Sequence, residues 1–260
     1  MTSTDLHFEL HGEEQEVAVV RLTRGKKRNA LNDGLILALR DQFDQFPASV
    51  RAAVIDGEGE HFCAGLDLSE LKERDAGQGL HHSRMWHSAL ERLQFGPVPV
   101  VAALHGAVVG GGLELASACH IRVADETTFY ALPEGSRGIF VGGGGSVRIP
   151  KLIGVARMTD MMMTGRVYNA QDGERAGFAQ YLVPTGSAFD KALELAKRIA
   201  TNAPLTNYAL MHALPRIAEQ PSDQGLMTEA LMAAIAQSAP EAKDRVRAFL
   251  DGRAAKVSKS

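Results

Sequence analysis

Two patterns of apolar and polar positions alternate along most of the chain. Short apolar runs bounded by turn residues predict strands, and apolar residues three or four positions apart predict helices. The predicted strands are residues 6–10, 17–22, 52–56, 98–104 and 180–183. The predicted helices are residues 32–45, 66–74, 81–95, 155–165 and 170–176, with a mobile polar loop expected at 75–79. The first two strands read as a hairpin, and the order of elements predicts an α/β fold.

Beyond Pro184 the pattern contains helices alone. They are predicted at residues 188–202, 205–217, 225–236 and 241–250. Only a short turn precedes them, without a long linker rich in Pro, Gly or Ser, so we expect a C-terminal region and not an independent domain. The prediction is therefore a core of residues 1–189 followed by a helical region of residues 190–260.

Composition and charge narrow the class of protein. The chain has 260 residues, 45% of them hydrophobic, which is enough to bury a full core. Its formal net charge is -3, with Lys and Arg spread along the sequence, so we predict neither a nucleic-acid partner nor a membrane surface. We see no signal peptide and no stretch as long as a membrane span. Two cysteines, Cys63 and Cys119, do not suggest a disulfide framework and suit a reducing compartment, so a cytoplasmic protein is expected.

Three consecutive glycines, Gly110 to Gly112, separate a buried strand from an apolar helix start. Glycine allows unusual backbone angles and lets a ligand approach bare N–H groups. The free N–H groups at a helix N-terminus also favour negative charge. Glu114 interrupts the apolar first turn, and a carboxylate is costly to bury without a role. The alternative is a glycine-rich turn whose glutamate points to solvent.

Two other segments carry matching groups. The sequence HFCAGLDL places Leu66 directly after a glycine, where its backbone N–H could serve as a second donor to an oxyanion. The sequence LPEGSRGI adds another acid, Glu134. Glu114 and Glu134 are twenty residues apart, too far for one helix face, so they would have to meet in the fold. The glycines at 142–145 read as a flexible turn.

The motifs RNAL, FCAGLDL, HGAVVGGGLELA and LPEGSRGIFVGGGGSVRIPKLIG occur in the order and spacing of the crotonase (enoyl-CoA hydratase/isomerase) superfamily, which the chain resembles over nearly its whole length. The resemblance implies a ββα spiral core with a CoA thioester site, followed by a helical trimerisation region. It places the two oxyanion-hole amides on Leu66 and Gly111. It places the two hydratase glutamates on Glu114, which would activate water, and on Glu134, which would protonate the α-carbon. Because many members lack one or both acids, the pair favours an enoyl-CoA hydratase.

The resemblance also implies the binding partners. A basic loop matches the region that holds the CoA nucleotide, and nearby positions match substrate contacts. The candidates are Lys26, Lys27, Arg28, Ala30, Ala64, Asp67 and Leu68. No metal, flavin or nicotinamide is expected, since CoA is part of the acyl-CoA substrate. The family resemblance further implies a homotrimer or a hexamer built as a dimer of trimers.

Substrate and final product stay open. The same oxyanion hole serves isomerases and thioester hydrolases, and some members hydrate a small heteroatom-bearing enoyl-CoA and then release CoA, as the methylthioacryloyl-CoA hydratase type does. The acyl pocket is expected to include Met85, Trp86 and residues 75–79 and 138–141. RNA binding is known in one family member, but residues 32–45 carry one basic residue and three acids, which disfavours it.

Motifs of other enzyme classes are missing from the sequence. There is no G-x-G-x-x-G between a strand and a helix, no P-loop and no G-x-S-x-G elbow. His81, His82 and His87 lack the spacing of a helical zinc pair. Cys63 lies near the proposed amide donor but has no histidine partner by spacing, so a structural thiol is favoured over a nucleophile.

Overall fold

The structure is a computed structural model that describes residues 5–70 and 73–253. The chain divides into two compact units, Met1–Ala200 and Thr201–Ser260. The boundary expected from the sequence, after residue 189, would cut helix α7 (Ala188–Ala200) near its start. In the structure the whole of α7 belongs to the first unit, because its apolar face packs in a core with the sheet.

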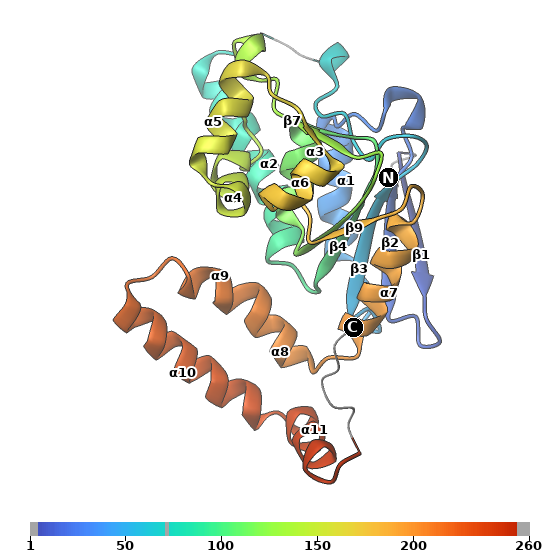
Figure 1. Cartoon of the computed structure of the whole chain (residues 1–260), viewed down its shortest axis with the longest axis vertical. Helices are drawn as coiled ribbons and strands as arrows, with labels where there is room; N and C mark the ends of the chain where they lie inside the picture. The colour runs from blue at the N-terminus through green and yellow to red at the C-terminus, as the bar shows by residue number, and fades with distance from the viewer. Residues whose placement is uncertain (1–4, 71–72, 254–260) are drawn as a thin grey trace. The chain divides into compact units, whose positions relative to one another are not determined.

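Within the described residues, the larger sheet of the first unit has six strands (Figure 1). Their order is β1 (Leu6–His11), β2 (Val17–Leu22), β3 (Ala52–Gly57), β4 (Val100–Leu104), β6 (Ile121–Asp125) and β9 (Tyr181–Val183). The first two strands form the predicted antiparallel hairpin, and every later pair is parallel. Parallel neighbours need crossover connections. The parallel sheet with intervening helices confirms the predicted α/β class.

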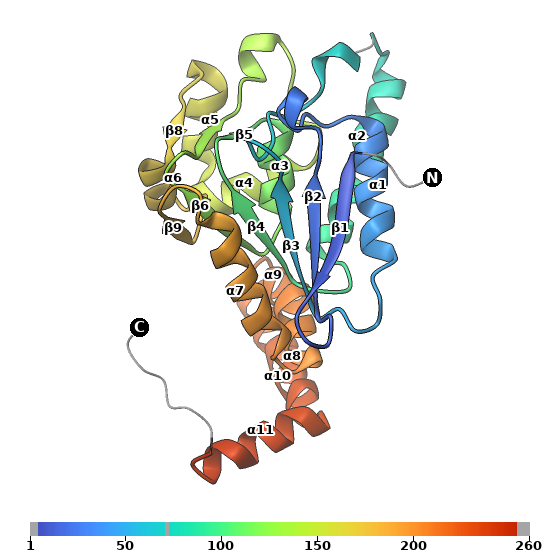
Figure 2. The same cartoon turned by 90° about the vertical axis from the view of Figure 1, so that its right-hand side faces the viewer.

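Both faces of this sheet are buried. On β3, Ile55 points into the larger core, whereas its neighbour Val54 points into a second core on the opposite face. The larger core receives α1 (Asp33–Asp44) and α2 (Ala76–Gln94), and the second receives α7 (Figure 2). Strands buried on both sides are typical of parallel sheets, and they explain why the sequence shows continuous apolar runs instead of strict alternation.

A small second sheet positions the glycine corner. It contains β5 (Ala107–Val109), β7 (Phe129–Ala131) and β8 (Tyr168–Asn169). Gly110 follows β5 directly, and α3 (Gly111–Ala118) begins at the next residue, so the predicted turn from a strand into a helix is confirmed. All residues of α3 are buried. Its N-terminal end therefore lies inside the first unit.

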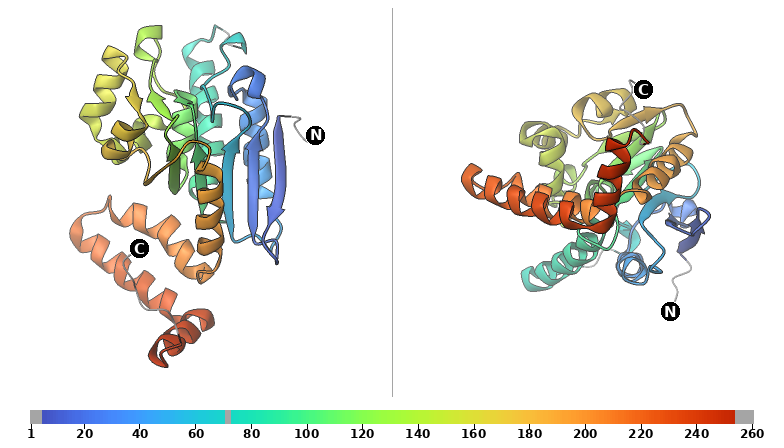
Figure 3. Two further views of the ribbon diagram at one scale, coloured as in Figure 1. Left: turned by 45° about the vertical axis from the view of Figure 1, so that its right-hand side comes forward. Right: turned by 90° about the horizontal axis from the view of Figure 1, so that it is seen from below.

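The other helices complete the two units. The first unit contains η1 (Gly25–Lys27), η2 (Leu68–Glu70), η3 (Gly135–Arg137), α4 (Gly145–Ile153), α5 (Val155–Thr164) and α6 (Ala170–Ala176). The second contains α8 (Pro204–Tyr208), the π-helical turn η4 (Ala209–Ala213), α9 (Leu214–Ile217), α10 (Ser222–Ser238) and α11 (Pro240–Leu250). Helix α10 folds back along α8 and α9 (Figure 3). Among the described residues, no helix combines the length and the apolar character that a membrane crossing requires.

Several local predictions were wrong. Residues 76–79 form the first turn of α2 and are not a loop, because Asp75 Oδ1 accepts the N–H of Gln78 (2.8 Å) while Gln78 Oε1 accepts the N–H of Asp75 (3.2 Å). This reciprocal capping box starts the helix. Helix α4 begins at Gly145, inside the expected flexible turn. The predicted helix 66–74 is also wrong where the structure describes it, because only Leu68–Glu70 forms a short 3-10 turn and residues 66–67 and 73–74 are not helical. Residues 71–72 lie outside the described residues.

Candidate active site

Four segments that are distant in sequence meet around a cavity of about 300 Å³. They are the loop after β3, the corner before α3, one face of α2 and residues 134–143. Leu66, Gly111, Glu114 and Glu134 all line this cavity. The fold therefore brings together the four residues that the sequence analysis assigned to the reaction.

The N–H groups of Leu66 and Gly111 are available to a ligand. Leu31 N–H donates to Gly65 O (2.7 Å) and Asp67 N–H donates to Leu31 O (2.7 Å), which turns the Leu66 N–H away from Leu31. Gly111 is the first residue of α3, so its N–H has no acceptor within the helix. Across residues 5–70 and 73–253, neither N–H has a hydrogen-bond acceptor. A methyl group on Gly111 would lie 3.6 Å from the Leu66 nitrogen, so the two donors are close.

Each of the three glycines is required for its own reason. Gly110 has a φ of +51°, and a Cβ there would lie 2.7 Å from Glu134 Oε1. A Cβ on Gly111 would lie 3.3 Å from the Trp86 ring, directly beside the donor. A Cβ on Gly112 would lie 2.3 Å from a backbone oxygen of the neighbouring loop. Side chains at these positions would strain the backbone or fill the space beside the amides.

A second glycine run holds the carboxylate of Glu114. Its Oε1 accepts hydrogen bonds from the N–H groups of Gly143 and Gly145, both at 2.8 Å. A Cβ on Gly143 would lie 3.1 Å from Glu114 Oε2, and one on Gly145 would lie 2.8 Å from its Cγ. Glu114 is only 4% exposed. The expected flexible turn is thus a carboxylate-binding loop, which local sequence patterns could not reveal.

Two side chains orient this loop. Ser83 Oγ on α2 donates to the carbonyl of Gly142 (2.5 Å), and Arg148 Nη1 donates to the carbonyl of Gly143 (2.9 Å). The N–H and C=O of a trans peptide point in opposite directions. The bond from Ser83 to Gly142 O therefore directs the Gly143 N–H of the same peptide toward Glu114.

Glu134 is buried beside the first glycine run. It is 7% exposed and precedes η3, with its Oε1 facing Gly110. Its Oε2 is buried and has no hydrogen-bond partner within the described residues. A buried oxygen without a partner is costly and requires an explanation. A ligand entering the cavity would supply the missing partner.

Burial raises the pKa of both glutamates. For Glu114 the loss of water is the largest cause, the hydrogen bonds from Gly145 and Gly143 oppose it, and the charge of Glu134 adds to it. For Glu134 the loss of water is again the largest cause of the raised pKa. Two carboxyl groups in one cavity also disfavour double ionisation. The arrangement is suited to one protonated acid and one ionised base.

Trp86 forms the wall between the free amides and the Glu114 loop. Its ring lies 3.3 Å from a Cβ built on Gly111 and 3.2 Å from one built on Gly143. Its Nε1 donates to Asp33 Oδ1 (3.1 Å), and His82 Nε2 contacts the same oxygen (2.7 Å). The structure thus places Trp86 in the lining of the cavity with the two glutamates and shows how α1 holds it there.

The other predicted binding residues lie in different places. Ala64 and Leu68 line the cavity with the glutamates. Lys26 lines a separate cavity of about 520 Å³ beside η1, and Arg28 is exposed at the end of η1 with a φ of +51°. Met85 is absent from the cavity lining and packs against the larger core. The structure therefore does not bring Lys26 and Arg28 together with the glutamates.

Asp67 and Ala30 hold the loop that carries Leu66. The buried carboxylate of Asp67 accepts hydrogen bonds from Arg24 and Lys27, both at 2.8 Å. Arg24 also donates to the carbonyl of Ala30. The hydrogen bond from Lys27 is the largest cause that keeps the pKa of Asp67 well below its usual range. These contacts fix the backbone on both sides of the Leu66 N–H.

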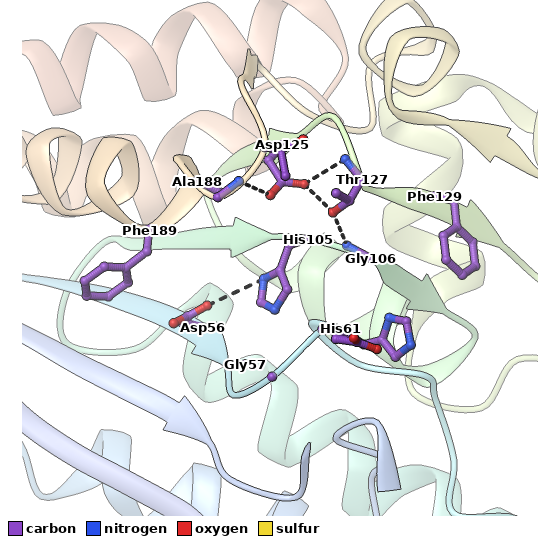
Figure 4. Close-up of a pocket in the computed structure, with 14 residues that line it drawn as sticks. Asp56, Gly57, His61, His105, Gly106, Asp125, Thr127, Phe129, Ala188 and Phe189 are labelled. Carbon is purple, nitrogen blue, oxygen red and sulfur yellow. Dashed lines mark hydrogen bonds and ion pairs between the residues drawn. The ribbon is translucent and has the colours of Figure 1, made fainter. Parts of the chain in front are cut away.

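A larger cavity, of about 550 Å³, lies at the carboxyl ends of β3, β4 and β6 (Figure 4). Two of the acids that line it, Asp56 and Asp125, already have partners. Asp125 Oδ1 accepts hydrogen bonds from the N–H (2.9 Å) and the hydroxyl (2.5 Å) of Thr127. Asp56 pairs with Arg21 at 3.0 Å and lies 3.8 Å from His105. These groups stabilise the ends of the strands, and we assign them a structural role.

Neither cysteine has the environment of a nucleophile. Cys63 and Cys119 are buried, and burial raises the pKa of each thiol to about 12. The reactive form of a cysteine is the thiolate, so both remain inert thiols at neutral pH. Among the residues that the structure describes, no group of three His, Cys, Asp or Glu side chains could hold a metal ion.

Comparison with known proteins shows related sequences and structures over nearly the whole chain. Residues 12–259 match the family model described as enoyl-CoA hydratase/isomerase. A 2,3-dehydroadipyl-CoA hydratase of Escherichia coli is 32% identical over 92% of this chain and 94% of its own length. A short-chain-enoyl-CoA hydratase of Clostridium acetobutylicum is 30% identical over 92% and 93%. The crystal structure of a Rhodopseudomonas palustris protein, provisionally named an enoyl-CoA hydratase, superposes with a TM-score of 0.93 at 61% identity, covering 96% of both chains.

Proposed function

The chain belongs to the enoyl-CoA hydratase/isomerase family, and from that premise we propose that it adds water across the α,β double bond of an acyl-CoA thioester. The family match agrees with the resemblance to the crotonase superfamily seen in the sequence. One observation carries the choice of hydration: two buried carboxyl groups and two uncommitted N–H groups converge in a single cavity. Hydration needs one group to activate water and another to protonate carbon, and two carboxyl groups can fill both roles.

In the proposed reaction, the thioester carbonyl oxygen lies between the N–H groups of Leu66 and Gly111. Ionised Glu114 removes a proton from water as the water oxygen bonds to the β-carbon. The π electrons of the double bond move toward the thioester, and negative charge collects on its oxygen, where the two N–H groups stabilise it. Protonated Glu134 then delivers its proton to the α-carbon as the carbonyl re-forms. The product has gained one water, and the two carboxyl groups have exchanged protonation states.

We propose that no metal, flavin or nicotinamide takes part in this reaction, and that CoA enters as part of the substrate. Ala64 and Leu68 are placed to contact the CoA arm near the thioester, because they line the cavity beside Leu66. Lys26 and Arg28 are exposed cations outside it. Exposed cations suit the phosphates at the distant end of CoA.

The test of the proposed function is an assay on a panel of enoyl-CoA thioesters. Crotonyl-, acryloyl-, methylthioacryloyl-, long-chain and cinnamoyl-CoA are supplied, and loss of the conjugated double bond and release of free thiol are followed in parallel. Loss of the double bond without free CoA supports a hydratase. Free CoA at a comparable rate identifies hydrolysis after hydration, and movement of the double bond identifies an isomerase. No reaction with any thioester would contradict the proposal.

We expect Gly111→Ala to lower the rate of hydration by at least about tenfold. Alanine keeps the backbone N–H, but its methyl group hinders the approach of the thioester oxygen to a donor whose complete loss typically lowers a rate by about 10² to 10³. The new methyl group would lie 3.3 Å from Trp86 and 3.6 Å from the Leu66 nitrogen, in the space for the thioester oxygen. Gly34→Ala is the matched control, because its methyl group would lie 3.6 Å from Asn32 Oδ1, an ordinary contact on α1. Equal rates for the two variants would remove Gly111 from the oxyanion site.

We also propose that copies of the chain assemble as a trimer or a dimer of trimers. On α10, Met227, Leu231 and Ile235 recur every four residues and are 63%, 58% and 46% exposed. An exposed apolar stripe of this kind is typical of a protein interface. Light scattering at micromolar concentration should give three or six times the mass of the chain, and a monomer would contradict the assembly.

A further inference from the structure

The cavity contains two cationic side chains that the hydration mechanism leaves unused. Arg74, just before α2, and Arg137, at the end of η3, both line it. The acids in the described lining are Glu114 and Glu134, which the reaction already employs. The arginines therefore need another role within the same cavity.

Neither arginine donates a hydrogen bond within the described residues, and Arg74 has only a long ion pair. Arg74 approaches Asp33 Oδ2 only to 3.9 Å, and the other oxygen of Asp33 already accepts from His82 and Trp86. Among residues 5–70 and 73–253, Arg137 makes no hydrogen bond and no ion pair within 4 Å, although its charge partly offsets the raised pKa of Glu134. A guanidinium group carries five N–H donors in a planar fork that matches a carboxylate. Two such forks with unused donors in one cavity indicate an anionic group in the ligand.

The direction in which the cavity extends shows which part of a ligand would reach Arg74 and Arg137. Trp86 lies against Gly111 and so marks the level of the thioester carbonyl. Gly79, about two turns earlier on α2, still lines the cavity, which therefore extends about 10 Å along the helix toward its N-terminus. Arg74 directly precedes that end. The start of α2 and the segment after β7 lie at the same end of the first unit (Figures 1 and 2).

The walls along this path are apolar. Leu68 lines one side, and Ile139, Phe140 and Val141 line another. Such walls suit a hydrocarbon chain. Arg137 is exposed and the Arg74 side chain is 25% exposed, so both guanidinium groups lie where the cavity opens to solvent. A chain that ended in a methyl group would offer them no partner. A chain that ended in a carboxylate would satisfy them.

We propose that the substrate is an enoyl-CoA whose acyl chain ends in a second carboxylate, bound by Arg74 and Arg137. This inference rests on the proposed function of the cavity as an acyl-CoA site. The thioester end is held by the amides of Leu66 and Gly111, the chain runs between Trp86 and the apolar wall, and the terminal carboxylate meets the two arginines. The arginines determine specificity and leave the addition of water to the glutamates.

The test is a binding measurement that does not depend on hydration. Titration calorimetry compares adipoyl-CoA with hexanoyl-CoA, saturated thioesters of equal chain length that differ in the terminal carboxylate. We expect the native protein to bind adipoyl-CoA at least about tenfold more tightly, the usual scale of a charge-assisted contact. Arg74→Gln and Arg137→Gln should each reduce this ratio, and the double variant should abolish it. Arg84→Gln, an exposed position of α2 outside the cavity, is the matched control and should retain the ratio.

Two results would overturn the inference. Equal affinity of the native protein for both thioesters would show that the carboxylate is not recognised. An equal loss of affinity for both thioesters in the arginine variants would show that the arginines contact the CoA phosphates. The hydration assay separates this inference from the proposed function. If the protein hydrates hexenoyl-CoA but binds adipoyl-CoA no more tightly than hexanoyl-CoA, this inference fails and the proposed function stands. A preference in binding without hydration of either unsaturated thioester would refute the proposed function and leave the carboxylate site standing.

Discussion

The Glu114→Gln variant should hydrate crotonyl-CoA at least about a hundredfold more slowly than the native protein, since positioned acid–base catalysis contributes about 10² to 10⁴. The amide oxygen of glutamine can still accept the hydrogen bonds that Gly143 and Gly145 donate to Oε1. The loop therefore keeps its anchor while the site loses the group that removes a proton from water. The rate is measured as loss of the conjugated double bond under saturating substrate.

A matched control separates this chemical effect from a change in fold. Glu91 is an exposed glutamate of α2 outside the cavity lining, and Glu91→Gln should hydrate at the native rate. Far-ultraviolet circular dichroism and the thermal midpoint should agree among the native protein and both variants. A Glu114→Gln variant within a few-fold of the native rate would exclude Glu114 as the base.

The elements with strong periodic patterns were predicted well, because local interactions determine them. Asn32 was expected to open a helix, and its side chain accepts the N–H of Leu35 (2.8 Å) at the start of α1. The hairpin of β1 and β2 likewise follows from two short apolar runs joined by a tight turn. In both cases the residues that determine the element lie within it or directly beside it in the sequence.

Strand β6 was not predicted, because a charge interrupts its apolar pattern. Arg122 is 3% exposed, an unusual position for a charged residue. Its guanidinium donates to the carbonyls of Phe178 (2.7 Å) and Cys119 (2.6 Å), and burial lowers its pKa. These acceptors come from other parts of the chain. No local pattern in the sequence indicates that the arginine is satisfied in the interior.

The start of α2 was missed although its signal was present. Two glycines among residues 76–79 suggested a loop, since glycine is unfavourable within helices. Asp75 and Gln78 nevertheless have the spacing of a capping box, and in the structure they satisfy each other's backbone N–H groups. The stabilisation from this capping box outweighs the low helix propensity of the two glycines. The spacing could have been recognised from the sequence.

The candidate site was predictable only in part. The family resemblance identified Glu114 and Glu134, but spacing alone could not show that they meet. The glycine loop that holds Glu114 looked like a flexible turn, because its amides bind a carboxylate 29 residues earlier in the chain. The role of Asp33 in holding Trp86 depends on contacts between α1 and α2. Such partners are determined by the tertiary fold and leave no periodic trace in the sequence.

The Glu134→Gln variant should also lose at least about a hundredfold in hydration rate, because it removes the acid that protonates the α-carbon. The pH profile distinguishes this role from that of the base. In the native protein, activity should fall at low pH as Glu114 is protonated and at high pH as Glu134 loses its proton. Burial raises the pKa of both groups, so both limbs should lie above the ordinary range of a glutamate. The residual activity of Glu134→Gln should lack the limb at high pH.

The stability of Glu134→Gln provides the control. The substitution should lower the rate of hydration but should not lower the free energy of unfolding at neutral pH. Because burial raises the pKa of Glu134, the folded state binds its proton more tightly than the unfolded state does. The free energy of unfolding of the native protein should therefore fall as pH rises from the unfolded pKa, about 4.3, to the raised folded value.

The Glu134→Gln variant avoids this loss, because glutamine carries no charge to bury. The substitution also breaks no hydrogen bond to Oε2 within the described residues, because Oε2 accepts none there. At neutral pH the variant should be at least as stable to urea as the native protein, and this advantage should vanish below about pH 4. A variant that lost both activity and stability at neutral pH would show that Glu134 supports the fold, whereas slow hydration by an equally or more stable protein would identify it as the acid.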